Sequence, residues 1–311
     1  MDSYHEPVLF GEAITALNVQ PGGVYVDGTL GGGGHASGIL ARLNGTGRLF
    51  GIDKDTDALT SAAGRLRGAA NLTLIHGDFH DMAALLAGHG ASSIDGALLD
   101  LGVSSHQLDT PERGFSYHSN APLDMRMDAG QGETAADMLA RLDEAGLSRI
   151  FREYGEENWS SRVAKVIVSR RERSPIRTTL DLVDCVDAAV PKPVRMRDTG
   201  HPARRVFQAL RIAVNDELAP LERSLESIVG MLNPGGRLCV ITFHSLEDRI
   251  VKQTFARLRK PCACPPDFPV CVCGKLPTIS MFGAKPISPA GDEVTRNPRS
   301  RGARLRAVEK L

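Results

Sequence analysis

In the N-terminal third of the chain, short apolar runs alternate with segments in which apolar residues recur at helical spacing. Short apolar runs predict four strands, at residues 24–27, 48–53, 72–75 and 94–100. Apolar residues at helical spacing predict helices between them, at residues 36–43, 57–66 and 82–86. Strands separated by helices of this length form βαβ units, so we expect an α/β fold with a doubly wound, mostly parallel sheet.

The alternation stops at Gly102, and helical spacing then dominates as far as Arg205. The helices expected in this stretch are 133–142, 147–154 and 159–173. The α/β pattern resumes with helical spacing over 207–232 and a strand at 237–243. We therefore expect a discontinuous core, residues 1–103 and 206–311, and an inserted helical domain over 104–205.

Two local features follow that strand. Ser245 and Asp248 match a helix start in which Ser245 is the N-cap and Asp248 the reciprocal acid. Beyond Lys260 the chain is rich in Pro, Gly and Cys, which predicts a long loop.

The composition says little about which molecules the protein binds. The chain has 311 residues, with 37 Lys or Arg and 37 Asp or Glu, so an RNA-binding role would depend on local basic patches. No apolar run reaches membrane-spanning length, and the N-terminus lacks the features of a signal peptide. We expect a cytoplasmic protein, with its six cysteines as thiols or metal ligands rather than disulfides.

A glycine cluster at the first strand–helix joint predicts a ligand site. It reads Asp27-Gly28-Thr29-Leu30-Gly31-Gly32-Gly33-Gly34-His35, and glycines at such a joint let the backbone approach a ligand closely. A nicotinamide dinucleotide and S-adenosylmethionine both remain possible here. Asp27 favours S-adenosylmethionine, because a carboxylate is unfavourable beside a pyrophosphate but favourable beside a sulfonium and an ammonium.

The second and third strands end in residues that suit the rest of such a ligand. Asp53 can accept both ribose hydroxyls, for either cofactor. Phe79 can cover one face of an adenine. The fourth strand ends at Asp100, where the transferred methyl group is expected, but no Pro-Pro-aromatic sequence follows as it does in many amino-group methyltransferases.

Seven segments together resemble the ribosomal RNA small-subunit methyltransferase H family, the cytosine-N4 methyltransferases of bacterial 16S rRNA. The segments are residues 5–9, 27–35, 100–107 with 114–117, 122–128, 201–211, 242–248 and 297–301. The resemblance implies a class I (Rossmann-like) methyltransferase fold. It also implies that the protein methylates a P-site cytosine, either in free 16S rRNA or in the assembled small subunit. It implies cofactor contacts at Gly33, Gly34, His35, Asp53, Phe79, Asp100 and Gln107.

Several residues are candidates for the chemistry and for RNA contact. Asp100 is the first candidate to accept the amino proton, with Asp124 and Asp128 as alternates. Stacking on the cytosine is open to Phe115 and Tyr117, although ordinary packing explains them equally well. The arginines Arg204, Arg205, Arg299 and Arg301 are expected to contact RNA phosphates. His244 is expected to line the substrate site.

Four cysteines form two Cys-x-Cys pairs in the segment after Lys260: Cys262, Cys264, Cys271 and Cys273. Four thiols so close in sequence predict either a structural zinc site or free thiols.

Three other functions remain open for the protein as a whole. They are a methyltransferase for another nucleic acid or a protein amino group, a nicotinamide oxidoreductase, and an RNA-binding scaffold without activity. The sequence leaves monomer and homodimer open.

Overall fold

The structure is a computed structural model that describes residues 7–197, 201–265, 270 and 272–311. The chain forms two compact units. We call Met1–Gly102 with Leu218–Leu311 the core unit, and Val103–Glu217 the inserted unit. None of the described helices is both long enough and apolar enough to cross a membrane.

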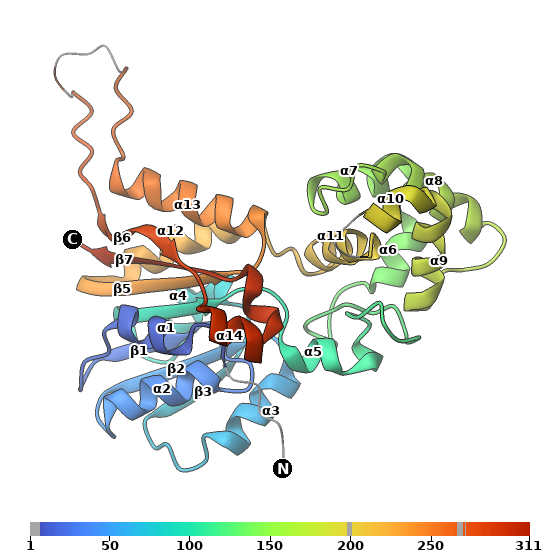
Figure 1. Cartoon of the computed structure of the whole chain (residues 1–311). Helices are drawn as coiled ribbons and strands as arrows, with labels where there is room; N and C mark the ends of the chain where they lie inside the picture. Colours follow the sequence, from blue (N-terminus) through green and yellow to red (C-terminus); the bar gives the residue numbers. More distant parts are fainter. Residues whose placement is uncertain (1–6, 198–200, 266–269, 271) are drawn as a thin grey trace. The chain divides into compact units, whose positions relative to one another are not determined.

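In its described residues the core unit contains a 7-stranded sheet in the order β3-β2-β1-β4-β5-β7-β6 (Figure 1). The first five strands are parallel, and β7 runs antiparallel to both β5 and β6. The predicted mostly parallel α/β fold is confirmed. The strands are β1 (Val24–Asp27), β2 (Arg48–Asp53), β3 (Leu72–His76), β4 (Ile94–Asp100), β5 (Leu232–Thr242), β6 (Ile279–Ile287) and β7 (Arg304–Lys310).

Helices cover both faces of this sheet, because successive strand residues point to opposite sides. On one face Phe50 and Val240 pack with α4 (Met82–Gly88), α12 (Leu221–Met231) and α13 (Ser245–Arg259). On the other, Leu49 and Cys239 pack with α1 (Phe10–Leu17), α2 (Gly34–Leu43) and α3 (Thr56–Arg65). The short helices η1 (Phe79–Asp81), α14 (Gly291–Arg296) and η3 (Pro298–Gly302) complete the unit.

The inserted unit is helical and has its own apolar core. Residues such as Phe151, Ile167, Val186 and Leu210 are fully buried in it. Its helices are α5 (Ser105–Asp109), η2 (Pro111–Arg113), α6 (Ala135–Arg141), α7 (Glu144–Glu153), α8 (Ser160–Arg171), α9 (Thr179–Ala189), α10 (Lys192–Arg197) and α11 (Ala203–Asn215). The unit extends to Glu217 rather than to residue 205, because α11 buries its apolar face in this core.

The segment 207–232 forms two helices, not one continuous helix. Helix α11 ends at Asn215, where Asp216 adopts a left-handed conformation with φ of 48°. Helix α12 starts after Pro220, whose ring is compatible with a helix start but not with a helix interior. The apolar spacing continues through the break because each helix buries its own face.

Two expectations about the C-terminal third are wrong. The N-cap of α13 is His244, whose reciprocal partner is Glu247, rather than Ser245 with Asp248. The chain beyond Lys260 is not one long loop, because it forms β6 and β7. Strand β7 was not predicted because arginines alternate with its apolar residues. Arg304 and Arg306 donate hydrogen bonds to Asp248 on α13, while Leu305 and Ala307 are buried.

Asp248 therefore joins α13 to β7. Its carboxylate accepts a hydrogen bond from Arg306 Nε at 2.8 Å and one from Arg304 Nη1 at 3.2 Å. Burial alone would raise the pKa of Asp248, but the two arginines outweigh it and hold this pKa below its usual value.

We expect Asp248→Asn to lower the free energy of unfolding by roughly 1–3 kcal/mol, since it weakens three hydrogen bonds from the charged side chains of Arg304 and Arg306. Because the folded-state pKa is lowered, this stabilisation is fully present at neutral pH, begins to fall near pH 4 and is lost as pH falls through the lowered pKa. Thermal melts at pH 7 and pH 3 measure the effect. Glu222→Gln, which alters an exposed ion pair with Arg257, is the control and should change the melting temperature little. Equal destabilisation by Asp248→Asn at both pH values would contradict the account.

Candidate active site

Three carboxylates lie at the carboxyl ends of adjacent strands in the core unit. Asp27 ends β1, Asp53 ends β2 and Asp100 ends β4, and β1 pairs with both of the other strands. The strand order reverses between β1 and β4, which is where open α/β sheets bind ligands. We call these three residues the acidic site.

The loop after β1 is shaped by its glycines and by the acidic site. Gly31 and Gly33 have φ of 50° and 75°, in the left-handed region that favours glycine. The Gly31 backbone N–H donates to Asp53 Oδ2 at 2.8 Å, which fixes the loop against β2. A Cβ atom at Gly31 would meet nothing within 4 Å, whereas one at Gly33 would meet Leu66 at 2.9 Å. The loop is therefore open at Gly31 and closely packed at Gly33.

Among the described residues, Lys54 partly offsets the charge of Asp53, and no Lys or Arg does so for Asp27 or Asp100. Burial raises the pKa of Asp27 to about 7 and that of Asp53 to about 6. Burial, followed by the charges of Asp27 and Glu247, raises the pKa of Asp100 well above its usual value. Among the described residues, Asp27 Oδ2 and Asp100 Oδ1 are buried without a hydrogen-bond partner. A cationic ligand would supply the missing partner, and a pyrophosphate would not.

His35 does not neutralise this charge. Its ring is buried, with Nε2 3.1 Å from the Val8 carbonyl oxygen and Nδ1 3.7 Å from Asp100 Oδ2. Burial lowers the pKa of His35 to about 4, against the opposing hydrogen bond to Val8. The imidazole is therefore neutral at physiological pH, and its contact with Asp100 is polar rather than ionic.

Comparison with known proteins identifies the family. The sequence model of the MraW methylase family matches residues 2–311. The chain belongs to the MraW methylase family. Two similar proteins are both named Ribosomal RNA small subunit methyltransferase H. That of Symbiobacterium thermophilum is 55% identical over 312 residues, covering 100% of this chain and 98% of that protein. That of Pelobacter propionicus is 52% identical over 309 residues, covering 99% and 98%.

Family membership confirms the resemblance seen in the sequence and supports S-adenosylmethionine, rather than a nicotinamide dinucleotide, as the cofactor of this methylase. The residues present fit that cofactor. Unpartnered buried carboxylate oxygens suit its two positive charges, and the backbone at Gly31 leaves room for a close approach.

Two residues that the sequence did not single out belong to this site in the methylase. Thr29 Oγ1 accepts the Asp100 backbone N–H at 2.6 Å and so fixes the end of β4 against the glycine loop. Glu247 is buried, lies 2.9 Å from His244 Nε2 and raises the pKa of Asp100 through its charge. The links of Thr29 and Glu247 to Asp100 leave no signal in local sequence, because each joins residues far apart in the chain.

The other predicted residues of the core unit occupy different settings. Phe79 is half-buried at the start of η1, with its ring centroid 4.0 Å from that of His80. His244 caps α13 and contacts Glu247. Arg299 and Arg301 are exposed on η3.

In the inserted unit, several predicted residues have a structural partner of their own. The Gln107 side chain is buried and closes a capping box with Ser104 at the start of α5. Asp124 forms a bidentate ion pair with Arg126, at 2.9 and 2.7 Å, and Asp128 accepts the Gly130 backbone N–H. Burial would raise the pKa of Asp124, but Arg126 outweighs it and lowers this pKa, so the carboxylate is a weak proton acceptor.

The aromatic and basic candidates of the inserted unit differ in how buried they are and in whether they have a structural partner. Phe115 is buried in the helical core, and Tyr117 packs half-buried beside His201 and Phe207. Arg204 is exposed, whereas Arg205 Nη1 lies 3.7 Å from the buried Glu157 carboxylate.

A basic surface that sequence analysis missed lies on α8. A hollow there is lined by Arg162, Lys165, Val166, Ser169, Arg170 and Arg173. The available signal was two pairs of basic residues three positions apart, Arg162 with Lys165 and Arg170 with Arg173, since residues at this spacing share one helix face.

Proposed function

We propose that this methylase transfers a methyl group from S-adenosylmethionine to N4 of a P-site cytosine in the 16S rRNA of the small ribosomal subunit. The observation that carries the reaction is the acidic site, with its buried and unpartnered carboxylate oxygens at Asp27 and Asp100. The ribosomal RNA substrate is supported by the names of the relatives, and the N4 position and the P site by the resemblance of the sequence segments. A ribosomal substrate places the protein in the cytoplasm.

The acidic site and its neighbours provide the cofactor contacts in this proposal. Asp27 faces the positive charge of the cofactor, and Asp53 accepts the ribose hydroxyls. Phe79 covers the adenine, and the backbone of Gly31 to His35 borders the remainder. When bound, the cofactor supplies a methyl group on a sulfonium whose charge disappears on transfer.

Asp100 has the position expected of the proton acceptor. As the cytosine N4 lone pair forms the new N–C bond, the nitrogen becomes cationic and must lose a proton. Asp100 Oδ1 is buried without a partner among the described residues, so it is available to accept that proton. Cofactor binding favours the ionised form of Asp100, because a nearby cation stabilises the carboxylate.

The inserted unit is the proposed RNA-binding part of the chain. A cytosine in folded RNA must leave its stack before its N4 reaches an enzyme site, so contacts to the flanking phosphates are needed to hold the strand. The exposed Arg162 and Lys165 on α8 and Arg173 just beyond its end offer such contacts, together with Arg204.

We expect the triple variant Arg162→Ala/Lys165→Ala/Arg173→Ala to bind small-subunit RNA more weakly and with a flatter salt dependence. If each residue contacts one phosphate of single-stranded RNA, the slope of log affinity against log salt falls by about 2. Fluorescence anisotropy over a salt series measures both quantities. Arg257→Ala, on the exposed surface of the core unit, is the charge-loss control and should leave the slope unchanged. An unchanged slope in the triple variant would exclude α8 as a phosphate-binding surface.

Nucleoside mass spectrometry tests the proposed reaction. Small subunits and naked 16S rRNA from a strain lacking the corresponding gene are incubated with the protein and S-adenosylmethionine, digested and analysed. The proposal predicts one new N4-methylated cytidine at the P site in at least one of the two substrates. A methyl group on another base, or on protein alone, would show that the substrate is a different one. No new methyl group on any of these molecules would favour an RNA-binding scaffold without activity.

A further inference from the structure

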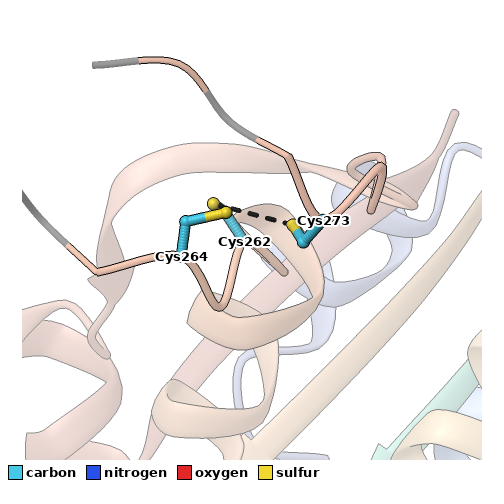
Figure 2. Close-up of side chains that lie close together, drawn as sticks. All are labelled: Cys262, Cys264 and Cys273. Carbon is cyan, nitrogen blue, oxygen red and sulfur yellow. Dashed lines mark hydrogen bonds between the residues drawn. The ribbon is translucent and has the colours of Figure 1, made fainter. Parts of the chain in front are cut away.

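Three thiols converge in the segment that joins α13 to β6. Cys262 and Cys264 follow the end of α13, and Cys273 precedes β6. Their sulfur atoms all lie within 4.8 Å of one another, and Cys273 Sγ is 3.8 Å from Cys262 Sγ. Figure 2 shows the three side chains directed toward a common point, from two stretches of chain that run side by side.

The sulfur spacing matches two ligands of one metal ion. A zinc–thiolate bond is about 2.3 Å long, so the edge of a tetrahedral zinc site, from sulfur to sulfur, is about 3.8 Å. A disulfide would bring the two sulfur atoms to about 2.05 Å. The distance between Cys273 and Cys262 therefore corresponds to shared coordination rather than to a covalent bridge.

A backbone hydrogen bond orients one of the three sulfur atoms. The Val272 N–H donates to Cys264 Sγ at 3.4 Å. Metal ligands commonly accept such additional hydrogen bonds, which orient the ligand and stabilise the charge on it. Val272 lies between two cysteines in sequence, so the bond ties the second Cys-x-Cys stretch to the first.

Packing does not account for the convergence. The described side chains nearby include Val270, Val272 and Leu276, which are 70%, 72% and 79% exposed. Neither apolar cluster of the core unit contains a residue from the described parts of 260–278. Cys185 and Cys239 differ in this respect, because both are fully buried in apolar cores. In Figure 1 the described residues at both ends of this segment extend away from the sheet beyond α13.

We propose that Cys262, Cys264 and Cys273 hold a structural Zn²⁺ that cross-links the segment between α13 and β6. Soft thiolate ligands select zinc over magnesium or calcium, and zinc needs no redox partner to bind them. A closed tetrahedral site requires a fourth ligand. The sequence offers Cys271 for that position, although it lies outside the described residues. The site is separate from the methyl-transfer chemistry, so the proposal does not depend on the proposed function.

Metal analysis of the full-length protein, purified reduced and without a polyhistidine tag, tests the proposal. Inductively coupled plasma mass spectrometry should find about one zinc per chain. Cys262→Ser and Cys273→Ser should each reduce this to a small fraction, while Cys185→Ala should leave it unchanged. Because the segment lies outside the apolar clusters, circular dichroism should show that both serine variants still fold.

Two further readouts define the ligands and the outcome that would overturn the site. Replacing zinc by Co²⁺ should give thiolate charge-transfer bands and the ligand-field bands of a tetrahedral site. Retention of these bands in Cys271→Ser would assign the fourth position to another ligand. Protein that holds no zinc after purification and reloading, or zinc content unaffected by Cys262→Ser and Cys273→Ser, would exclude the proposed site. Non-reducing mass spectrometry that finds a native disulfide between these cysteines would also exclude it.

Discussion

Asp100→Asn is expected to abolish most methyl transfer while leaving the fold intact. The amide is nearly the same size as the carboxyl group, and the Asp100 backbone N–H keeps its hydrogen bond to Thr29. What is lost is the group that accepts the N4 proton, and removing a positioned proton acceptor typically lowers a rate about 10²–10⁴-fold. Single-turnover assays with saturating cofactor and small subunits measure this rate directly.

Two other acids provide the comparison for this variant. Asp124→Asn alters the carboxylate paired with Arg126, and Asp81→Asn alters an exposed acid outside the acidic site. The account predicts that Asp81→Asn keeps the wild-type rate and that Asp124→Asn loses less than Asp100→Asn. If Asp100→Asn keeps a rate within threefold of wild type, or if Asp124→Asn shows the larger loss, Asp100 is not the proton acceptor.

Asp27→Asn is expected to stabilise the cofactor-free protein at pH 8 and to weaken its binding of S-adenosylmethionine. Burial raises the folded-state pKa of Asp27 from 3.8 to about 7. The folded protein therefore holds this proton more tightly than the unfolded chain does, so stability falls as pH rises from about 4 to 7 and stays reduced above 7. The two pKa values correspond to a loss of roughly 4 kcal/mol, which is an upper limit because the surroundings relax. The neutral amide avoids this loss.

Thermal melts at pH 5 and pH 8, with and without S-adenosylmethionine, measure both effects. Without cofactor, Asp27→Asn should melt several degrees above wild type at pH 8, and the difference should shrink at pH 5, where Asp27 is protonated. At pH 8 the cofactor should raise the melting temperature of wild type by more than that of the variant. A variant that is less stable at pH 8, or an unchanged response to the cofactor, would contradict the role given to Asp27.

Much of the core unit could be predicted because its strands are buried on both faces and read as continuous apolar runs. The acids of the acidic site were predictable for the same reason, since each directly ends such a run. Strand β7 was not, because Arg304 and Arg306 interrupt its apolar pattern and their partner Asp248 lies more than fifty residues upstream. Thr29 and Glu247 were missed because their contacts exist only once the sheet has formed.

The candidate residues of the inserted unit show a different limit. A polar side chain such as that of Gln107 fits either ligand binding or a helix cap, and sequence spacing contains both signals. Basic residues raise a similar ambiguity: Arg205 lies beside the buried Glu157, whereas Arg162 and Lys165 are exposed on α8. Burial and the identity of the partner decide between these roles, and both depend on tertiary packing.

The central claim is that the three carboxylates at the ends of β1, β2 and β4 hold a cationic methyl donor. Isothermal titration calorimetry of the purified protein at pH 6.5–7.5, in buffers of different ionisation enthalpy, with S-adenosylmethionine, S-adenosylhomocysteine and NAD tests it most directly. The account predicts one S-adenosylmethionine site per chain, proton release as the acids ionise near pH 7, and no heat with NAD. Binding of NAD, or S-adenosylmethionine binding without proton release near pH 7, would contradict it.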